Sequence, residues 1–136
     1  MSGEVGDSRK SAVRRVAGFT LIELLVVMVI IATLLTIAVP RYFHSLERSR
    51  EAVLRQDLAT LRESIDNFYG DKGEYPETLA ALVESHYLRS IPVDPIARSA
   101  EKWVVTLAEE PEDTGVKDVH SGAEGAGHDG VPYATW

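Results

Sequence analysis

The sequence contains no cysteine and carries an excess of acidic over basic residues. Without cysteine, the chain cannot be a disulfide-stapled scaffold, cannot bind a metal through thiolates and cannot use a thiol nucleophile. The formal net charge is −7, and residues 19–136 hold 10 basic against 19 acidic residues. Such an acidic body argues against binding to the phosphate backbone of nucleic acids, which depends on clustered lysine and arginine. The 136 residues suffice for one modest domain and a membrane element.

One long apolar run, of 21 residues, extends from Phe19 to Val39. As a helix it would be about 31 Å long, which is enough to cross a bilayer. Residues 1–18 carry four basic and two acidic residues, so the positive-inside rule places them in the cytoplasm and residues 41–136 across the membrane. The run is too long for a typical secretory signal peptide. A plain signal anchor is the alternative, with Glu23 reaching the interface, although a carboxylate in hydrocarbon costs at least ~2.5 kcal/mol.

A specific motif opens this run: Gly18-Phe19-Thr20-Leu21-Ile22-Glu23. Together with the basic leader, the long apolar run and Pro40 near its far end, it resembles the class III signal of type IV pilins and type II secretion pseudopilins. The resemblance implies that a prepilin peptidase cuts between Gly18 and Phe19 and that the new amine of Phe19 is N-methylated. The apolar helix then stays with the mature protein. Pro40 lacks an N–H, and we expect it to kink the helix.

The motif suggests a role for Glu23. Cleavage would create a cation at Phe19, four residues before Glu23 and on the same helix face. Because buried charges are tolerated only when paired, we expect Glu23 to pair with the amine of its own chain or of a neighbour. The family resemblance favours a neighbour. Such pairing would set the register of a protomer that leaves the bilayer and joins a fibre.

Past Pro40 the helical pattern becomes amphipathic. Apolar residues recur at spacings of three and four and form one stripe along the helix: Leu54, Leu58, Leu61, Ile65 and Phe68. Charged residues, Glu51 among them, are expected to fill the other faces of the helix. We expect one helix from Phe19 to about Tyr69, roughly 75 Å long. Turn residues then end it, and the remaining pattern predicts a short helix over 77–86 and strands over 103–107 and 116–120, joined by an acidic loop.

Landmarks in the second half narrow the resemblance. Gly73-Glu74-Tyr75-Pro76, Pro92-x-Asp94-Pro95 and a Gly-rich segment with Trp136 resemble the G-type pseudopilin of type II secretion. Many type IV pilins close their C-terminal region with a disulfide, so the lack of cysteine favours a pseudopilin. The segment 96–100, Ile-Ala-Arg-Ser-Ala, departs from the family pattern.

The resemblance implies an α+β, pilin-like fold, in which a long N-terminal α-helix packs on a small C-terminal domain. That domain is expected to hold a short helix and a few antiparallel β-strands. The expected parts are a cleaved cytoplasmic leader (1–18), a transmembrane and assembly half of the helix (19–39), an amphipathic half (40–70) and a small globular domain (71–136).

The G-type resemblance also implies calcium binding in the C-terminal loop. Asp118, Glu124 and Asp129 are the candidate ligands, and the surrounding glycines can present carbonyl oxygens. The loop is short and lacks the family's adjacent acidic pair, so a solvated acidic loop is the alternative. His120 and His128 would suit a transition metal, but two loosely spaced histidines are usually surface residues. No catalytic triad context and no phosphate-binding loop appears in the sequence.

These features predict a structural subunit and no enzyme. The subunit would polymerise into a short periplasmic pseudopilus that helps a type II machine export folded proteins across the outer membrane. Before assembly it would span the inner membrane once. Its expected partners are copies of itself, other pseudopilins, the prepilin peptidase, and the inner-membrane assembly platform with its ATPase, and not nucleic acid. The rivals are a type IV pilin of a surface filament for adhesion, motility or DNA uptake, and a membrane-anchored enzyme or ligand-binding domain.

Overall fold

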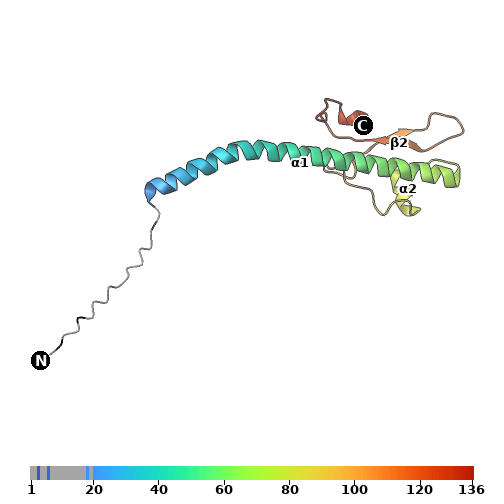
Figure 1. Ribbon diagram of the computed structural model, residues 1–136. Coiled ribbons are helices and arrows are strands. Elements are labelled where there is room, and N and C mark those ends of the chain that lie inside the picture. The colour runs from blue at the N-terminus through green and yellow to red at the C-terminus, as the bar shows by residue number, and fades with distance from the viewer. Residues whose placement is uncertain (1–2, 4–5, 7–17, 19) are drawn as a thin grey trace. The chain divides into compact units, whose positions relative to one another are not determined.

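The computed structural model describes Gly3, Gly6, Gly18 and residues 20–136. Helix α1 (Leu21–Lys72) is followed by α2 (Leu79–Glu84), the strands β1 (Val104–Leu107) and β2 (Val116–His120), and the 3-10 turn η1 (Tyr133–Thr135) (Figure 1). The chain divides into two compact units, an N-terminal unit (Met1–Val39) and a C-terminal unit (Pro40–Trp136). The long helix, the short helix and the antiparallel strands confirm the predicted α+β, pilin-like fold.

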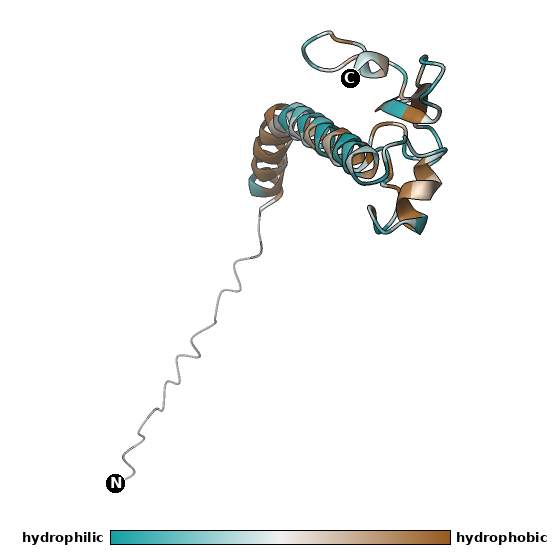
Figure 2. Cartoon of the chain, turned by 90° about the vertical axis from the view of Figure 1, so that its right-hand side faces the viewer, coloured by the Kyte–Doolittle hydropathy of each residue, from teal (hydrophilic) through white to brown (hydrophobic). Residues whose placement is uncertain are grey.

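Apart from Glu23 in its first turn, the first half of α1 is apolar on every side (Figure 2), and every residue from Thr20 to Val39 is exposed. Two threonines interrupt it, and each hydroxyl donates to the carbonyl four residues earlier. Thr33 Oγ1 lies 2.8 Å from the oxygen of Val29, and Thr36 Oγ1 lies 2.8 Å from the oxygen of Ala32. Because these hydroxyl protons are satisfied inside the helix, the segment is suited to surroundings without water. By length and composition it is apolar enough to cross a membrane.

Helix α1 ends at Lys72, three residues beyond the predicted end at Tyr69. The reason lies in the two glycines of the turn sequence. Gly70 remains helical, whereas Gly73 has a φ of 70° and donates its N–H to the carbonyl of Tyr69 at 2.8 Å. A residue in this left-handed conformation just after the last helical turn is a common helix stop, and glycine adopts it without strain.

The predicted apolar stripe of α1 forms the core of the C-terminal unit. All five of its members are buried. They join one cluster with residues of α2, β2 and the loops, namely Leu79, Leu82, Trp103, Val116, Val119, Ala123 and Tyr133. The indole nitrogen of Trp103 donates to the carbonyl of Pro92 at 2.8 Å, so its polar atom is satisfied inside the core.

Glu51 contradicts the expectation that charged residues fill the outer faces of this helix. The residue is buried, with 4% of its surface exposed. Glu51 lies three residues before Leu54, so it continues the spacing of three and four by one step toward the N-terminus. The expectation was wrong because it assigned Glu51 to solvent by residue type, whereas its position places it on the packed face.

The small elements pack around the second half of α1 (Figure 1). Helix α2 is shorter than the predicted 77–86 because Thr78 caps its start, with the side-chain oxygen accepting from the N–H of Ala81 at 3.2 Å. Strand β2 matches its predicted bounds, and β1 begins one residue later than predicted. The two strands pair antiparallel, with Val104 opposite His120 and an irregularity between Thr106 and Leu107.

Candidate functional site

The start of α1 holds two of the residues singled out in the sequence. The side-chain oxygen of Thr20 accepts from the backbone N–H of Glu23 at 3.2 Å, and Glu23 Oε2 accepts from the backbone N–H of Thr20 at 3.3 Å. This reciprocal pair is a capping box, in which both side chains satisfy backbone donors that the first helical turn leaves free. Glu23 therefore has a helix-starting role in a single chain.

The capping role of Glu23 was missed by reasoning from its charge alone. The signal was present in the sequence as Thr20-x-x-Glu23 at the start of the apolar run, which is the usual pattern of a capping box. The cap does not conflict with pairing to an amine, since Glu23 Oε1 has no hydrogen-bond partner among the described residues. One carboxylate can hold the helix start and still accept a cation from outside.

The predicted cleavage site lies at the edge of what the structure describes. Gly18 is exposed, and no atom lies within 4 Å of the position that a Cβ would take. Phe19, with its predicted cleavage and N-methylation, lies outside the described residues, as does most of the leader. Pro40 lies inside α1, where its missing N–H removes the helical bond to the carbonyl of Thr36. A kink at Pro40 stays a prediction.

Two of the three candidate calcium ligands pair with different arginines in the structure. Asp118 Oδ1 accepts from Arg62 Nε at 2.9 Å. Asp129 Oδ2 pairs with Arg55 Nη2 at 3.4 Å. Glu124 is exposed. Within residues 20–136 no group of three or more acidic or histidine side chains converges as a metal site.

The two histidines contact different residues. His120 Nδ1 contacts the backbone oxygen of Trp136 at 2.7 Å, while its Nε2 lies 3.6 Å from Asp118 Oδ2. His128 Nδ1 is hydrogen-bonded to Glu51 Oε2. His120 therefore binds the backbone of Trp136, whereas His128 binds Glu51 of α1, and the two histidines do not form a shared site.

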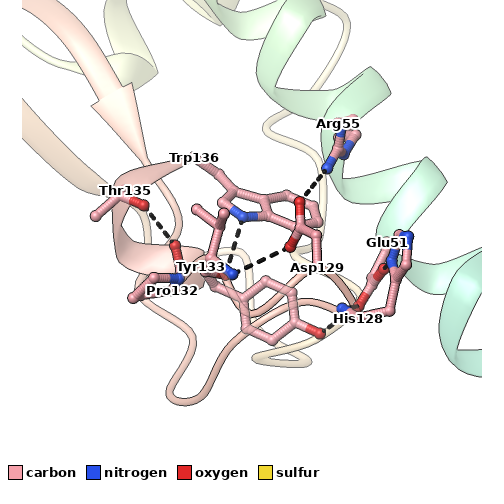
Figure 3. Close-up of polar contacts among 9 residues, drawn as sticks. Glu51, Arg55, His128, Asp129, Pro132, Tyr133, Thr135 and Trp136 are labelled. Atoms are coloured by element: carbon pink, nitrogen blue, oxygen red, sulfur yellow. Dashed lines mark hydrogen bonds and ion pairs between the residues drawn. The ribbon is translucent and has the colours of Figure 1, made fainter.

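Buried Glu51 gathers donors from the C-terminal loop (Figure 3). Its Oε1 accepts from the backbone N–H of His128 and from the hydroxyl of Tyr133, each at 2.9 Å. Burial raises the pKa of Glu51, but the hydrogen bonds from His128 and Tyr133 outweigh it and leave the pKa below its ordinary value of 4.5. Burial and the adjacent carboxylate raise the pKa of Tyr133 to about 12.

The lowered pKa gives Glu51 a pH-dependent contribution to stability. The folded state favours the ionised carboxylate, so the contribution is present above pH 4.5 and is lost as the pH falls through the lower folded pKa. Sequence reasoning did not find this residue, because its partners lie 77 and 82 positions away.

Comparison with known proteins shows which family motif the N-terminal region matches and which proteins the chain is similar to. A family model described as the prokaryotic N-terminal methylation motif matches residues 13–39. The type II secretion system core protein G of Pseudomonas aeruginosa is 32% identical over 98 residues, which cover 60% of this chain and 69% of the relative. That of Vibrio cholerae is 28% identical over 142 residues, covering 90% and 93%. The fimbrial protein EcpC of Eikenella corrodens is 35% identical over 81 residues, covering 56% and 53%. No solved structure matches the chain.

The exposed apolar helix, the glutamate that caps its start and the matched motif define a pilin-like protein with an N-terminal methylation signal. Within that class, the chain belongs to the family of type II secretion system core protein G, the G-type pseudopilins. The recognition made from the motifs is thereby confirmed, and so is the role in type II secretion.

Proposed function

We propose that this chain is a structural subunit that polymerises through α1 into a periplasmic pseudopilus, and that this fibre drives type II secretion across the outer membrane. The observation that carries the proposal is the first half of α1, which apart from Glu23 is apolar on all sides and is exposed along its whole length. Exposed apolar surface of this extent is unfavourable in water by roughly 25 cal/mol for each Å². It therefore needs lipid before assembly and the helices of neighbouring subunits afterwards.

The membrane topology follows from the charges around this helix. The leader carries four basic and two acidic residues, whereas the C-terminal unit is acidic. By the positive-inside rule the leader faces the cytoplasm and the C-terminal unit faces the periplasm. In this orientation the Gly18–Phe19 bond lies on the cytoplasmic side, where the prepilin peptidase of the resembled family acts, and Phe19 would be methylated there.

Assembly would use partners that this chain does not contain. Addition of a subunit to a fibre requires extraction from the bilayer, and no phosphate-binding loop for an ATP-driven step occurs in the sequence. We infer that an inner-membrane platform and its ATPase supply that work, and that neighbouring copies and other pseudopilins supply the cation that Glu23 accepts. The chain itself would perform no turnover.

A secretion experiment in the native host tests this function. Deleting the gene should remove a set of proteins from the culture medium and leave them in the periplasm, as measured by quantitative mass spectrometry of both fractions. Expression of the full chain should restore the set. An unchanged set of secreted proteins after deletion would contradict the proposal.

A surface filament is the second candidate, because the chain is also similar to a fimbrial protein. That similarity covers 56% of the chain, less than the 90% covered by one of the core protein G relatives. The same deletion strain separates the two functions. Loss of surface filaments, adhesion or motility with normal secretion would favour the filament, and loss of secretion alone favours the pseudopilus.

A further inference from the structure

The C-terminal loop, residues 121–131, rests on one face of α1 (Figure 3). Glu51, Arg55, Leu58 and Arg62 are spaced at four, three and four, so they lie along a single ridge of that helix. Three of the four carry charges, and each of these contacts a residue in or beside the C-terminal segment. The charged residues of this ridge therefore bind the loop to α1.

Glu51 makes the deepest of these contacts. Its carboxylate is buried and accepts from three donors, two on His128 and the hydroxyl of Tyr133. No buried side-chain nitrogen or oxygen in the described part of the chain lacks a partner. A buried carboxylate without hydrogen-bond donors would be strongly unfavourable. His128 and Tyr133 therefore supply the donors that Glu51 needs, and Glu51 in turn holds these residues against α1.

The two arginines hold the flanks of the loop. Arg55 pairs with Asp129, and its guanidinium lies over the ring of Trp136 at 4.3 Å from the centroid. Arg62 Nε donates to Asp118 Oδ1. Arg62 Nη2 donates to the backbone oxygens of Val119 at 2.9 Å and Trp136 at 2.7 Å. The two arginines therefore pair with two of the three candidate calcium ligands, Asp118 and Asp129.

Several oxygens of the loop accept hydrogen bonds from within the C-terminal unit. Gly127 O accepts from the N–H of Gly130 at 2.9 Å, and Gly125 O accepts from the N–H of Tyr133 at 3.1 Å. Asp129 Oδ1 accepts from the N–H of Val131 at 3.1 Å. Calcium takes six to eight oxygen ligands that converge on one point. The arrangement of Asp118, Glu124 and Asp129 does not fit such a site.

We propose that the Glu51 carboxylate, together with Arg55 and Arg62 further along the same ridge, fastens the C-terminal loop to α1 in place of a bound calcium ion. The loop is then held by side chains of this chain alone, and its order is independent of the calcium concentration. This inference concerns the C-terminal unit and stands whichever fibre the chain builds.

Limited proteolysis of the full chain in detergent micelles tests the proposal. A protease that cuts after glutamate reports on the loop directly, because Glu124 is exposed and lies within it. Cleavage after Glu124, followed by mass spectrometry, should proceed at the same rate in EDTA and in millimolar calcium chloride. The variant Glu51→Gln should be cleaved at least about tenfold faster in both solutions, since the amide presents donors where the carboxylate accepts them.

The control variants separate loss of the loop contact from a general effect. Glu63→Gln removes an exposed carboxylate from the same helix and should be cleaved like the parent chain. Tyr133→Phe removes one donor to Glu51 and keeps the ring, so an intermediate rate is expected, and this variant carries the test if Glu51→Gln fails to fold. Fluorescence of the two tryptophans, both in the C-terminal unit, reports folding.

Two results would overturn the proposal. The first is protection of Glu124 in the parent chain by calcium, relative to EDTA, by more than about tenfold, which would mean that a cation orders the loop. The second is a parent-like cleavage rate in both Glu51→Gln and Tyr133→Phe, which would mean that Glu51 does not hold it.

Discussion

Replacement of Glu23 by valine is expected to abolish pseudopilus assembly while leaving membrane insertion intact. Valine continues the apolar run, so the helix still enters the bilayer. Without the carboxylate, the methylated amine at Phe19 of a neighbouring subunit would be buried without a partner. Breaking a buried ion pair in this way costs about 3 kcal/mol or more, which weakens each contact by roughly 100-fold. Sheared fibres and the secreted proteins, both measured in the native host, should fall to the level of the deletion strain.

Two further variants separate the charge of Glu23 from its capping role. Glu23→Gln keeps a capping box, since glutamine serves at that position, but removes the charge. We expect it to fail in assembly as Glu23→Val does. Thr20→Ala removes the other half of the cap, at a cost of about 1 kcal/mol, and keeps the charge. We expect this variant to assemble.

The opposite pattern would reject the charge-pairing account. If Glu23→Gln assembles and secretes normally while Thr20→Ala does not, Glu23 acts through the helix start alone. A normal phenotype for Glu23→Val would go further, because it would remove the assembly role altogether and favour a membrane-anchored enzyme or binding domain.

Replacement of Asp94 by alanine is expected to destabilise the C-terminal unit more than any exposed substitution. The carboxylate is fully buried, and its Oδ1 accepts from the N–H groups of Ile96 at 2.8 Å and Ala97 at 3.0 Å. Its Oδ2 accepts from the hydroxyl of Ser121 at 2.5 Å, which ties this turn to the segment after β2. Removing the carboxylate leaves two backbone donors and one hydroxyl unsatisfied, at a cost of about 3 kcal/mol or more.

Thermal unfolding of the full chain, followed by tryptophan fluorescence, measures this loss. A reduction of about 3 kcal/mol should lower Tm by more than about 10 °C in a unit of this size. Asp94→Asn keeps the acceptor toward the two backbone N–H groups and should lose much less. Asp66→Ala, on an exposed position of α1, should be neutral. A Tm for Asp94→Ala equal to that of Asp66→Ala would contradict the role assigned to Asp94.

The periodic parts of the sequence predicted their structure well. The stripe from Leu54 to Phe68 gave the buried face of α1, because helix geometry turns a local spacing of three and four into one face. Strand β2 also lies over its predicted residues, and β1 was located from its β-branched and aromatic content to within one residue. The motif at Gly18 to Glu23 gave the family.

The contacts of the C-terminal loop were beyond such reasoning. Glu51 contacts His128 and Tyr133, which lie 77 and 82 residues later in the sequence. Arg62 contacts the backbone of Trp136 at a sequence separation of 74 residues. No local pattern encodes these distances, because they arise only once the core has brought the loop against α1. A glutamate between arginines resembles a solvent-exposed face until the fold is known. Charge type alone therefore misplaced Glu51, whereas its spacing relative to Leu54 would have placed it correctly.

Intact mass of the protein extracted from membranes of its native host tests the central claim most directly. The account predicts a chain that begins at Phe19 and is heavier by one methyl group, about 14 Da, than the sequence from that start. Such a chain would have been cut and methylated as the class III signal of pilins and pseudopilins implies. A chain that still carries residues 1–18, in cells that contain an active prepilin peptidase, would contradict the account and leave Glu23 with its capping role alone.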